Sequence, residues 1–263
     1  MLNDELVDAA TGIAIAAGKE ILDVYQRPGE MDVTIKADNS PLTEADQRAH
    51  NVIVAELAKL TPEIPILSEE SGHIGVAERR AWVRYWLVDP LDGTKEFIKR
   101  NGEFTVNIAL IDQGRPVMGI VHVPVSGETY RGLVGSGASK QDANGINNSI
   151  TCKKIEQEQS ALKVVSSRSH RGKELDGILG ALQQKFPDME LVSMGSSLKI
   201  CLVAEGKADL YPRLAPTCEW DTASAHAVLA AAGGIIVNTH FQELLYNQKD
   251  ELLNPFFIAI GDS

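Results

Sequence analysis

Apolar residues recur at helical spacing in the first twenty-five positions of the chain. The stripe consists of Leu6, Ala10, Ile13, Ala17, Ile21 and Val24. Because residues three and four apart share one face of a helix, the pattern predicts an amphipathic helix over residues 3–25. A second helix is predicted from Thr43 to about Leu60, with Asp46 at the capping-box position. Asp46 therefore has a structural role available at this helix start, and a functional role is equally open.

Runs of β-branched and apolar residues predict strands in the rest of the first half. These strands lie at 33–36, 64–68 and 82–88, and a short helix is predicted from Lys95 to Gly102. A meander follows, with strands at 104–111, 117–123 and 129–133 and a turn at Asp112–Arg115. Residues 134–148 are rich in glycine and asparagine, so we expect a loop there.

The second half alternates between strand and helix patterns. Strands are predicted at 162–165, 190–193, 208–211 and 235–237, and helices at 172–185, from 195–197 to about 205, and at 221–232. A polar run at 153–160 separates the halves, and we expect two subdomains, 1–157 and 158–263. The arrangement predicts an α+β or layered α/β fold with the active site between the subdomains.

Composition narrows the function classes. The 263 residues are 44% hydrophobic, enough for a core, and the net charge of −11 disfavours a basic face for nucleic acid. A small anionic substrate remains open, because local cations or a bound metal can invert the field of one cleft. The three cysteines show no CxxC spacing, which is typical of reduced thiols in the cytosol. We expect a cytoplasmic protein, because neither a signal peptide nor a stretch of transmembrane length is present.

The sequence Asp89-Pro90-Leu91-Asp92-Gly93-Thr94 follows a run typical of a buried strand. Two carboxylates so close together would repel unless a cation lay between them, although a solvated Asx turn would give the same pattern. Other carboxylates lie at the ends of further elements: Glu69 after 64–68, Asp221 before the late helix, and Asp46. Oxygen ligands of this kind suit Mg²⁺.

Two of these motifs resemble the signatures of the inositol monophosphatase superfamily of Mg²⁺-dependent, lithium-sensitive phosphatases. They are Asp89–Thr94 and Trp220-Asp221-Thr222-Ala223, and Leu67-Ser68-Glu69-Glu70 matches the third acidic element. The resemblance covers essentially the whole chain and implies a layered α/β/α/β/α sandwich. The finer likeness, through residues 36–41, 95–104 and 195–199, is to bacterial 3'(2'),5'-bisphosphate nucleotidases. Such enzymes convert adenosine 3',5'-bisphosphate (PAP) to AMP in sulfate assimilation, and PAPS is a second candidate substrate.

The resemblance implies a role for each matching residue. The metal ligands would be Glu69, Asp89, the Leu91 carbonyl, Asp92 and Asp221, holding two or three Mg²⁺ ions. Asp46 and Thr94 would orient and deprotonate the attacking water, with Glu69 also counted as catalytic. Substrate contacts would come from Asp92, Gly93, Thr94, His170, Ser196, Lys199, Arg213 and Asp221. His170 and Arg213 are the less secure matches, and Lys199 and Arg213 also fit solvated surface charges.

Several alternatives remain at this stage. An inositol monophosphatase or a sugar-bisphosphate phosphatase would share the metal site, so Lys199 with Arg213, suited to a second phosphate, is the distinguishing feature. A catalytically silent regulator would have lost a ligand, and a nuclease would need a basic, aromatic-lined path. We expect a small nucleotide as the partner, no nucleic acid, and a monomer rather than a homodimer. Peripheral attachment to the inner face of the membrane is possible in relatives. The sequence here predicts no basic amphipathic helix that would support it.

Overall fold

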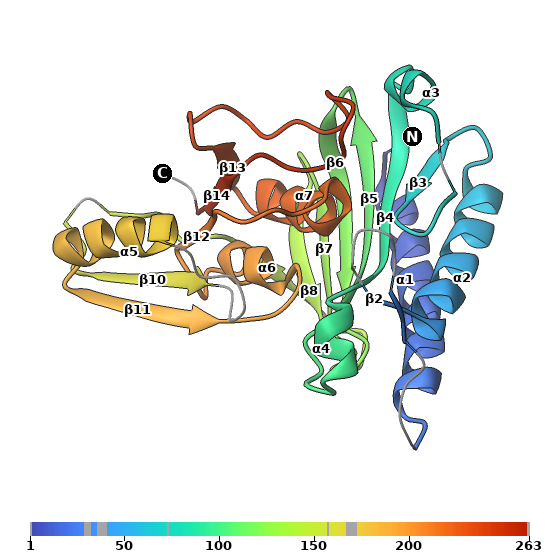
Figure 1. Cartoon of the computed structure of the whole chain (residues 1–263), viewed down its shortest axis with the longest axis horizontal. Coiled ribbons are helices and arrows are strands. Elements are labelled where there is room, and N and C mark those ends of the chain that lie inside the picture. The colour runs from blue at the N-terminus through green and yellow to red at the C-terminus, as the bar shows by residue number, and fades with distance from the viewer. Residues whose placement is uncertain are drawn as a thin grey trace.

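The computed structural model describes residues 2–28, 33–35, 41–72, 74–156, 158–166 and 173–261. Two long helices, α1 (Asp4–Tyr25) and α2 (Glu44–Leu60), form the outer layer on one side (Figure 1). Their buried faces join one apolar core with the facing side chains of the large sheet, including Trp86 and Ile108. The predicted helical stripe is therefore confirmed, because α1 buries Ala10, Ala17 and Ile21 completely. The short strands β1 (Val33–Ile35) and β2 (Pro41–Thr43) pair antiparallel ahead of α2.

The large sheet has seven strands in the order β3-β4-β5-β6-β7-β8-β9. Its strands are β3 (Ile66–Ser68), β4 (Arg84–Asp92), β5 (Thr105–Asp112), β6 (Arg115–His122), β7 (Thr129–Leu133), β8 (Gly137–Gln141) and β9 (Asn147–Ile150). Only β3 and β4 pair parallel, and the other neighbours are antiparallel. The loop predicted at 134–148 is wrong in part, because β8 and the start of β9 occupy seven of its fifteen residues. These strands are polar and half-exposed at the sheet edge. The pairing of β8 with β7 and of β9 with β8, rather than apolar alternation, makes them strands.

Two helices fill the space between the large sheet and a second, smaller sheet. They are α6 (Leu198–Ala204) and α7 (Ala223–Ala231), and nearly every residue of α7 is buried. The helix approaches the large sheet closely, since a Cβ at Gly119 would lie 2.0 Å from the Ser224 carbonyl oxygen. Glycine in β6 therefore lets α7 lie against the backbone of the sheet. The 3₁₀ turn η1 (Glu219–Asp221) immediately precedes α7.

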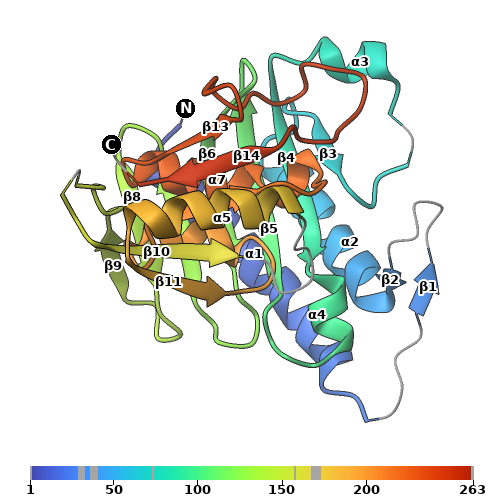
Figure 2. The same cartoon turned by 60° about the vertical axis from the view of Figure 1, so that its left-hand side comes forward.

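The smaller sheet has the order β11-β10-β12-β14-β13, with α5 (Lys173–Lys185) on its outer face (Figure 2). Its strands are β10 (Ala161–Ser166), β11 (Asp188–Ser193), β12 (Leu210–Arg213), β13 (Ile235–Asn238) and β14 (Phe257–Ile260). The predicted layered α/β/α/β/α sandwich is thus confirmed. Two further helices lie in the first half, α3 (Val76–Arg80) and α4 (Thr94–Ile98), and α4 ends four residues before the predicted Gly102.

The sequence reading missed α3 and β14. Helix α3 spans a single turn, and β14 is defined by antiparallel pairing to β12 and β13, strands that end at Arg213 and Asn238, well before β14 begins at Phe257. The proposed division at 157/158 stays a prediction. Helix α7 belongs to the second half of the chain but packs on β5, β6 and β7 of the first. None of the described helices combines the length and apolar character that a membrane span requires.

Candidate active site

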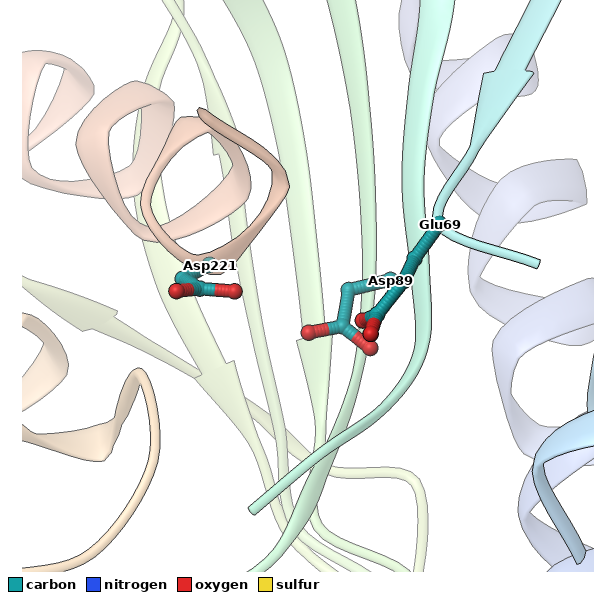
Figure 3. A group of neighbouring side chains, drawn as sticks. All are labelled: Glu69, Asp89 and Asp221. Carbon is teal, nitrogen blue, oxygen red and sulfur yellow. The ribbon is translucent and has the colours of Figure 1, made fainter. Parts of the chain in front are cut away.

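Three carboxylates from separate elements converge at one point (Figure 3). One oxygen each of Glu69, Asp89 and Asp221 lies within 4.8 Å of the others. The parallel pairing of β3 with β4 places Glu69 beside Asp89, and the Glu69 N–H donates to the Val88 carbonyl over 3.0 Å. Asp221 comes from the far side of the site, at the end of η1. The cluster therefore exists only when α7 is packed against the large sheet.

The electrostatics of this cluster fit a divalent cation. Burial, followed by the charges of Glu69, Asp92 and Asp221, raises the pKa of Asp89 well above its ordinary value. Burial, and then Asp92 and Glu69, likewise raises the pKa of Asp221. Charges packed this closely in a dry site oppose ionisation unless a positive charge compensates them. The donor set is all oxygen, which is what hard divalent cations such as Mg²⁺ prefer.

The turn after β4 is shaped by a register shift and a glycine. The pairing of β4 with β5 slips between Asp89 and Asp92, so the strand bulges where the motif begins. Within this bulge the Leu91 N–H donates to Asp89 Oδ1 over 3.0 Å. Gly93 then adopts φ 91°, the left-handed region that a side chain disfavours. The Leu91 side chain is buried, so only its carbonyl can face a ligand.

Asp92 is held in place from both sides of the cleft, by Asn107 on β5 and by Ser197 before α6. Its Oδ2 accepts the Ser197 N–H over 2.5 Å and the Asn107 amide over 3.4 Å. Burial raises the pKa of Asp92 to about 6, against the lowering effects of Lys199 and the Ser197 hydrogen bond. Asp92 lies outside the three-carboxylate group but close enough to raise the pKa of Asp89 and Asp221.

The two carboxylate oxygens of Asp46 have different partners, one in the cap of α2 and one at the candidate active site. Oδ2 accepts the Thr43 backbone N–H over 2.8 Å and the Thr43 hydroxyl over 2.6 Å, which completes the predicted capping box. Oδ1 lies 3.4 Å from the Thr94 hydroxyl. The two interpretations of Asp46 left open by the sequence are therefore compatible, because each uses a different oxygen.

A pocket opens beside the carboxylates and contains buried cations. Its lining includes Asp92, Gly93, Ser196, Lys199, Arg213 and Asp221. Lys199 and Arg213 are 9% and 8% exposed, so neither is a solvated surface charge. Lys199 donates to the Ser196 carbonyl, and Arg213 donates to the Ala215 and Pro216 carbonyls over 3.1 and 3.0 Å. Within the described part of the chain, neither cation forms an ion pair with a carboxylate.

The pocket favours an anion. Burial lowers the pKa of Lys199 to about 8, and the positive charge of Arg213 contributes to the lowering. Two like charges facing one cavity are stabilised when a negative ligand enters between them. The Ser196 hydroxyl has no hydrogen-bond partner among the described residues although it is buried, which leaves it available to a ligand. Ser196 precedes α6 rather than lying within it, so this helix begins slightly later than the predicted start at 195–197.

The remaining predicted residue is His170, which lies outside the described residues. Other residues at the site were missed by sequence reasoning. Glu103 accepts the Gly195 N–H over 2.7 Å, and Thr105, Asn107 and Ser197 surround the Asp92 carboxylate. Glu103 and Ser197 lay in segments with a family-like sequence, 95–104 and 195–199. Thr105 and Asn107 did not, and their contacts to Ser197 and Asp92 form between separate elements rather than within a motif.

The family is decided by comparison over the full length of the chain. A family model described as the inositol monophosphatase family matches residues 2–256. This chain belongs to the inositol monophosphatase family. The region matched by the family model includes the three carboxylates of Figure 3 and all the other described site residues.

Among relatives in this family, the protein named 3'(2'),5'-bisphosphate nucleotidase CysQ of Escherichia coli (strain K12) is 49% identical over 252 residues, covering 96% of this chain and 98% of that protein. The protein of the same name from Haemophilus influenzae is 37% identical over 261 residues, covering 99% and 94%. The crystal structure of CysQ from Bacteroides thetaiotaomicron superimposes with a TM-score of 0.86 at 45% identity and 98% coverage of both chains. An inositol monophosphatase from Anabaena has a TM-score of 0.75 at 25% identity, covering 99% of this chain and 92% of that one.

Proposed function

We propose that this chain is a metal-dependent 3'(2'),5'-bisphosphate nucleotidase that hydrolyses PAP to AMP and phosphate, with PAPS as a second substrate. The observation that carries this proposal is the pair of buried cations, Lys199 and Arg213, beside the carboxylate cluster. A substrate with two phosphates can present one to the carboxylate site and the other to these cations. An inositol monophosphate has no second phosphate to place there. Relatives that carry the nucleotidase name at 37–49% identity support the same assignment.

The metal site in this proposal consists of Glu69, Asp89, the Leu91 carbonyl, Asp92 and Asp221. These groups would hold two or three Mg²⁺ ions, which when bound would acidify water and neutralise the charge of the phosphate and the leaving oxygen. Burial, and after it the neighbouring carboxylates, raise the pKa of Asp89 and Asp221, which supports a cation at this place. The protein contributes the fixed positions of the ligands, which come from β4, the segment after β3, and η1.

The reaction in this proposal is direct transfer of the phosphoryl group to water. Asp46 and Thr94 receive the proton of the attacking water, since the Thr94 hydroxyl can donate to Asp46 Oδ1 and accept from water at the same time. Lys199, Arg213 and Ser196 bind the phosphate that is not cleaved. The pocket also has an apolar side formed by Met194, Tyr211 and Phe257, which suits a nucleoside base.

The subdomain assignment is part of the proposal. Residues 1–157 would supply most metal ligands, and residues 158–263 the nucleotide contacts and Asp221. We propose a cytoplasmic monomer, in keeping with the acidic composition and with three cysteines that form no disulfide among the described residues.

The test is phosphate release from PAP and from inositol 1-phosphate, measured in parallel with Mg²⁺ and then with lithium added. We expect lithium-sensitive turnover of PAP, and a large increase in KM for PAP in Lys199→Ala and Arg213→Ala. Lys249→Ala, at a lysine outside the pocket, is the control for loss of a positive charge. Preference for inositol 1-phosphate by the unmodified protein would overturn the substrate assignment and keep the metal site.

A further inference from the structure

The turn that carries Ser196 is fastened to the first half of the chain by two carboxylates. The Gly195 N–H donates to Glu103, and the Ser197 N–H donates to Asp92, over 2.7 and 2.5 Å. Ser196, between them, has a φ of 44°, an unfavourable backbone conformation for a residue with a side chain. Such strain persists where the surrounding structure fixes both flanking groups, and it often lies at functional sites.

A closed triangle of hydrogen bonds supports the same turn. The Ser197 hydroxyl lies 2.9 Å from Asn107 Oδ1 and 2.9 Å from the Thr105 hydroxyl, which lies 3.0 Å from Asn107 Oδ1. All three side chains are buried, with Thr105 and Asn107 fully inaccessible to solvent. The two hydroxyls supply only two protons for these three contacts, so both protons are used within the triangle, at least one of them on the Asn107 oxygen.

This arrangement fixes which way the Asn107 amide points. A carboxylate only accepts hydrogen bonds, so the NH₂ group faces Asp92, 3.4 Å from Oδ2, and the amide oxygen faces the two hydroxyls. Asp92 Oδ2 is thus held by an amide N–H and by the Ser197 backbone N–H. Among the described residues no donor reaches Asp92 Oδ1, so one carboxylate oxygen is oriented by the protein and the other is left to face a cation.

We infer that Thr105, Asn107 and Ser197 are positioning residues that set the Asp92 carboxylate for metal binding. The inference rests on the proposed function in one respect, that Asp92 is a metal ligand. Partners that orient a ligating carboxylate typically change metal affinity or activity about 10- to 100-fold when removed. The triangle does this from β5 and from the turn before α6, and so it forms only when the two sides of the cleft are assembled.

The test is calorimetric titration of the substrate-free protein with Mg²⁺ alone. Thr105→Val and Ser197→Ala each remove one hydroxyl and keep the backbone N–H, and Asn107→Asp places a second carboxylate against Asp92. We expect the Kd for Mg²⁺ to rise about 10-fold or more in each variant, and most in Asn107→Asp. Thr105→Ser, which keeps the hydroxyl, should restore the affinity of the unmodified protein.

The matched control is Thr129→Val. Thr129 is a fully buried threonine of the same sheet, and its hydroxyl bonds to His122 over 2.9 Å, away from the carboxylates. Its loss should lower the melting temperature and leave the Kd for Mg²⁺ unchanged. If the three network variants behave like Thr129→Val, or if the unmodified protein does not bind Mg²⁺, the inference is wrong. If Mg²⁺ binds and the variants weaken it while PAP is not hydrolysed, the network stands and the proposed substrate is wrong.

Discussion

The Thr94 hydroxyl lies 3.4 Å from Asp46 Oδ1 and 3.3 Å from the Leu91 carbonyl oxygen, so it joins the start of α4 to the first turn of α2. A hydroxyl has one proton and cannot donate to both acceptors at once. Thr94 can therefore turn between the backbone of the β4 turn and Asp46. This freedom is what a group needs if it is to pass a proton from water to a carboxylate.

Asp46→Asn should separate the catalytic role of this residue from its capping role. The amide oxygen can still accept from Thr43, so α2 should remain intact and the melting temperature should change little. Proton acceptance is lost, and kcat for phosphate release should fall about 10²- to 10⁴-fold. Glu44→Gln, which neutralises an exposed acid in the same helical turn, is the control and should retain activity. Equal activity in the two variants would remove Asp46 from the mechanism.

Asp89→Asn should stabilise the metal-free protein. Asp89 is buried among other carboxylates, whose repulsion raises its pKa, and an amide removes that repulsion while keeping the acceptor for the Leu91 N–H. In EDTA we expect a gain of about 1–2 kcal/mol in unfolding free energy, measured by urea denaturation. Excess Mg²⁺ should stabilise the unmodified protein by about 2.7 kcal/mol at 100 times Kd, and this gain should be absent in the variant. A variant less stable than its parent in EDTA would contradict the repulsion argument.

Gly119→Ala should loosen α7 from the large sheet. The new Cβ would lie 2.0 Å from the Ser224 carbonyl oxygen, and neither backbone can move aside without displacing a whole element. We expect the unfolding free energy to fall by about 1–3 kcal/mol or more. Mg²⁺ binding should also weaken, because α7 follows closely after Asp221. Gly12→Ala is the matched control, since nothing lies within 4 Å of a Cβ there and alanine favours the helix. A stable Gly119→Ala variant with normal Mg²⁺ affinity would show that α7 can shift freely.

His122 should make stability fall on acidification. Burial lowers its pKa to about 4, so below pH 6.5 the unfolded chain binds a proton that the folded protein does not. The contribution of His122 to stability is complete above pH 6.5, the pKa in the unfolded chain. It is lost as the pH falls toward about 4, the pKa in the folded protein. Between pH 7 and 5 we expect His122 to contribute a loss of about 2 kcal/mol, measured by urea unfolding, and the total decline should be smaller by that amount in His122→Gln.

The control for that experiment is His240→Gln, a change at an exposed histidine. It tests whether loss of any imidazole alters the pH dependence. If His122→Gln keeps the full decline between pH 7 and 5, the decline belongs to other groups, such as His226, whose pKa burial lowers to about 3.

The sequence determined the elements whose signals are local. Three signals follow from residues within a few positions of one another: the apolar stripe of α1, the capping box at Thr43 and Asp46, and Gly233-Gly234, which follow α7 closely and are a helix-stop signal. The acidic motif at 89–94 and its likeness to a phosphatase family were also readable, because metal chemistry requires particular residue types at short spacing. These local patterns were sufficient to predict the fold class and to name candidate ligands.

Only the tertiary structure decided which strands pair and which side chains lie opposite one another. Strands β8 and β9 carry too few apolar residues to be recognised, and their pairing partners define them. Lys199 and Arg213 read equally well as surface charges until packing buried them in one pocket. The hold of Asn107 and Ser197 on Asp92 spans 15 and 105 residues of sequence. Contacts of that kind depend on the joint packing of two sheets and the helices between them, and no short stretch of sequence encodes such an arrangement.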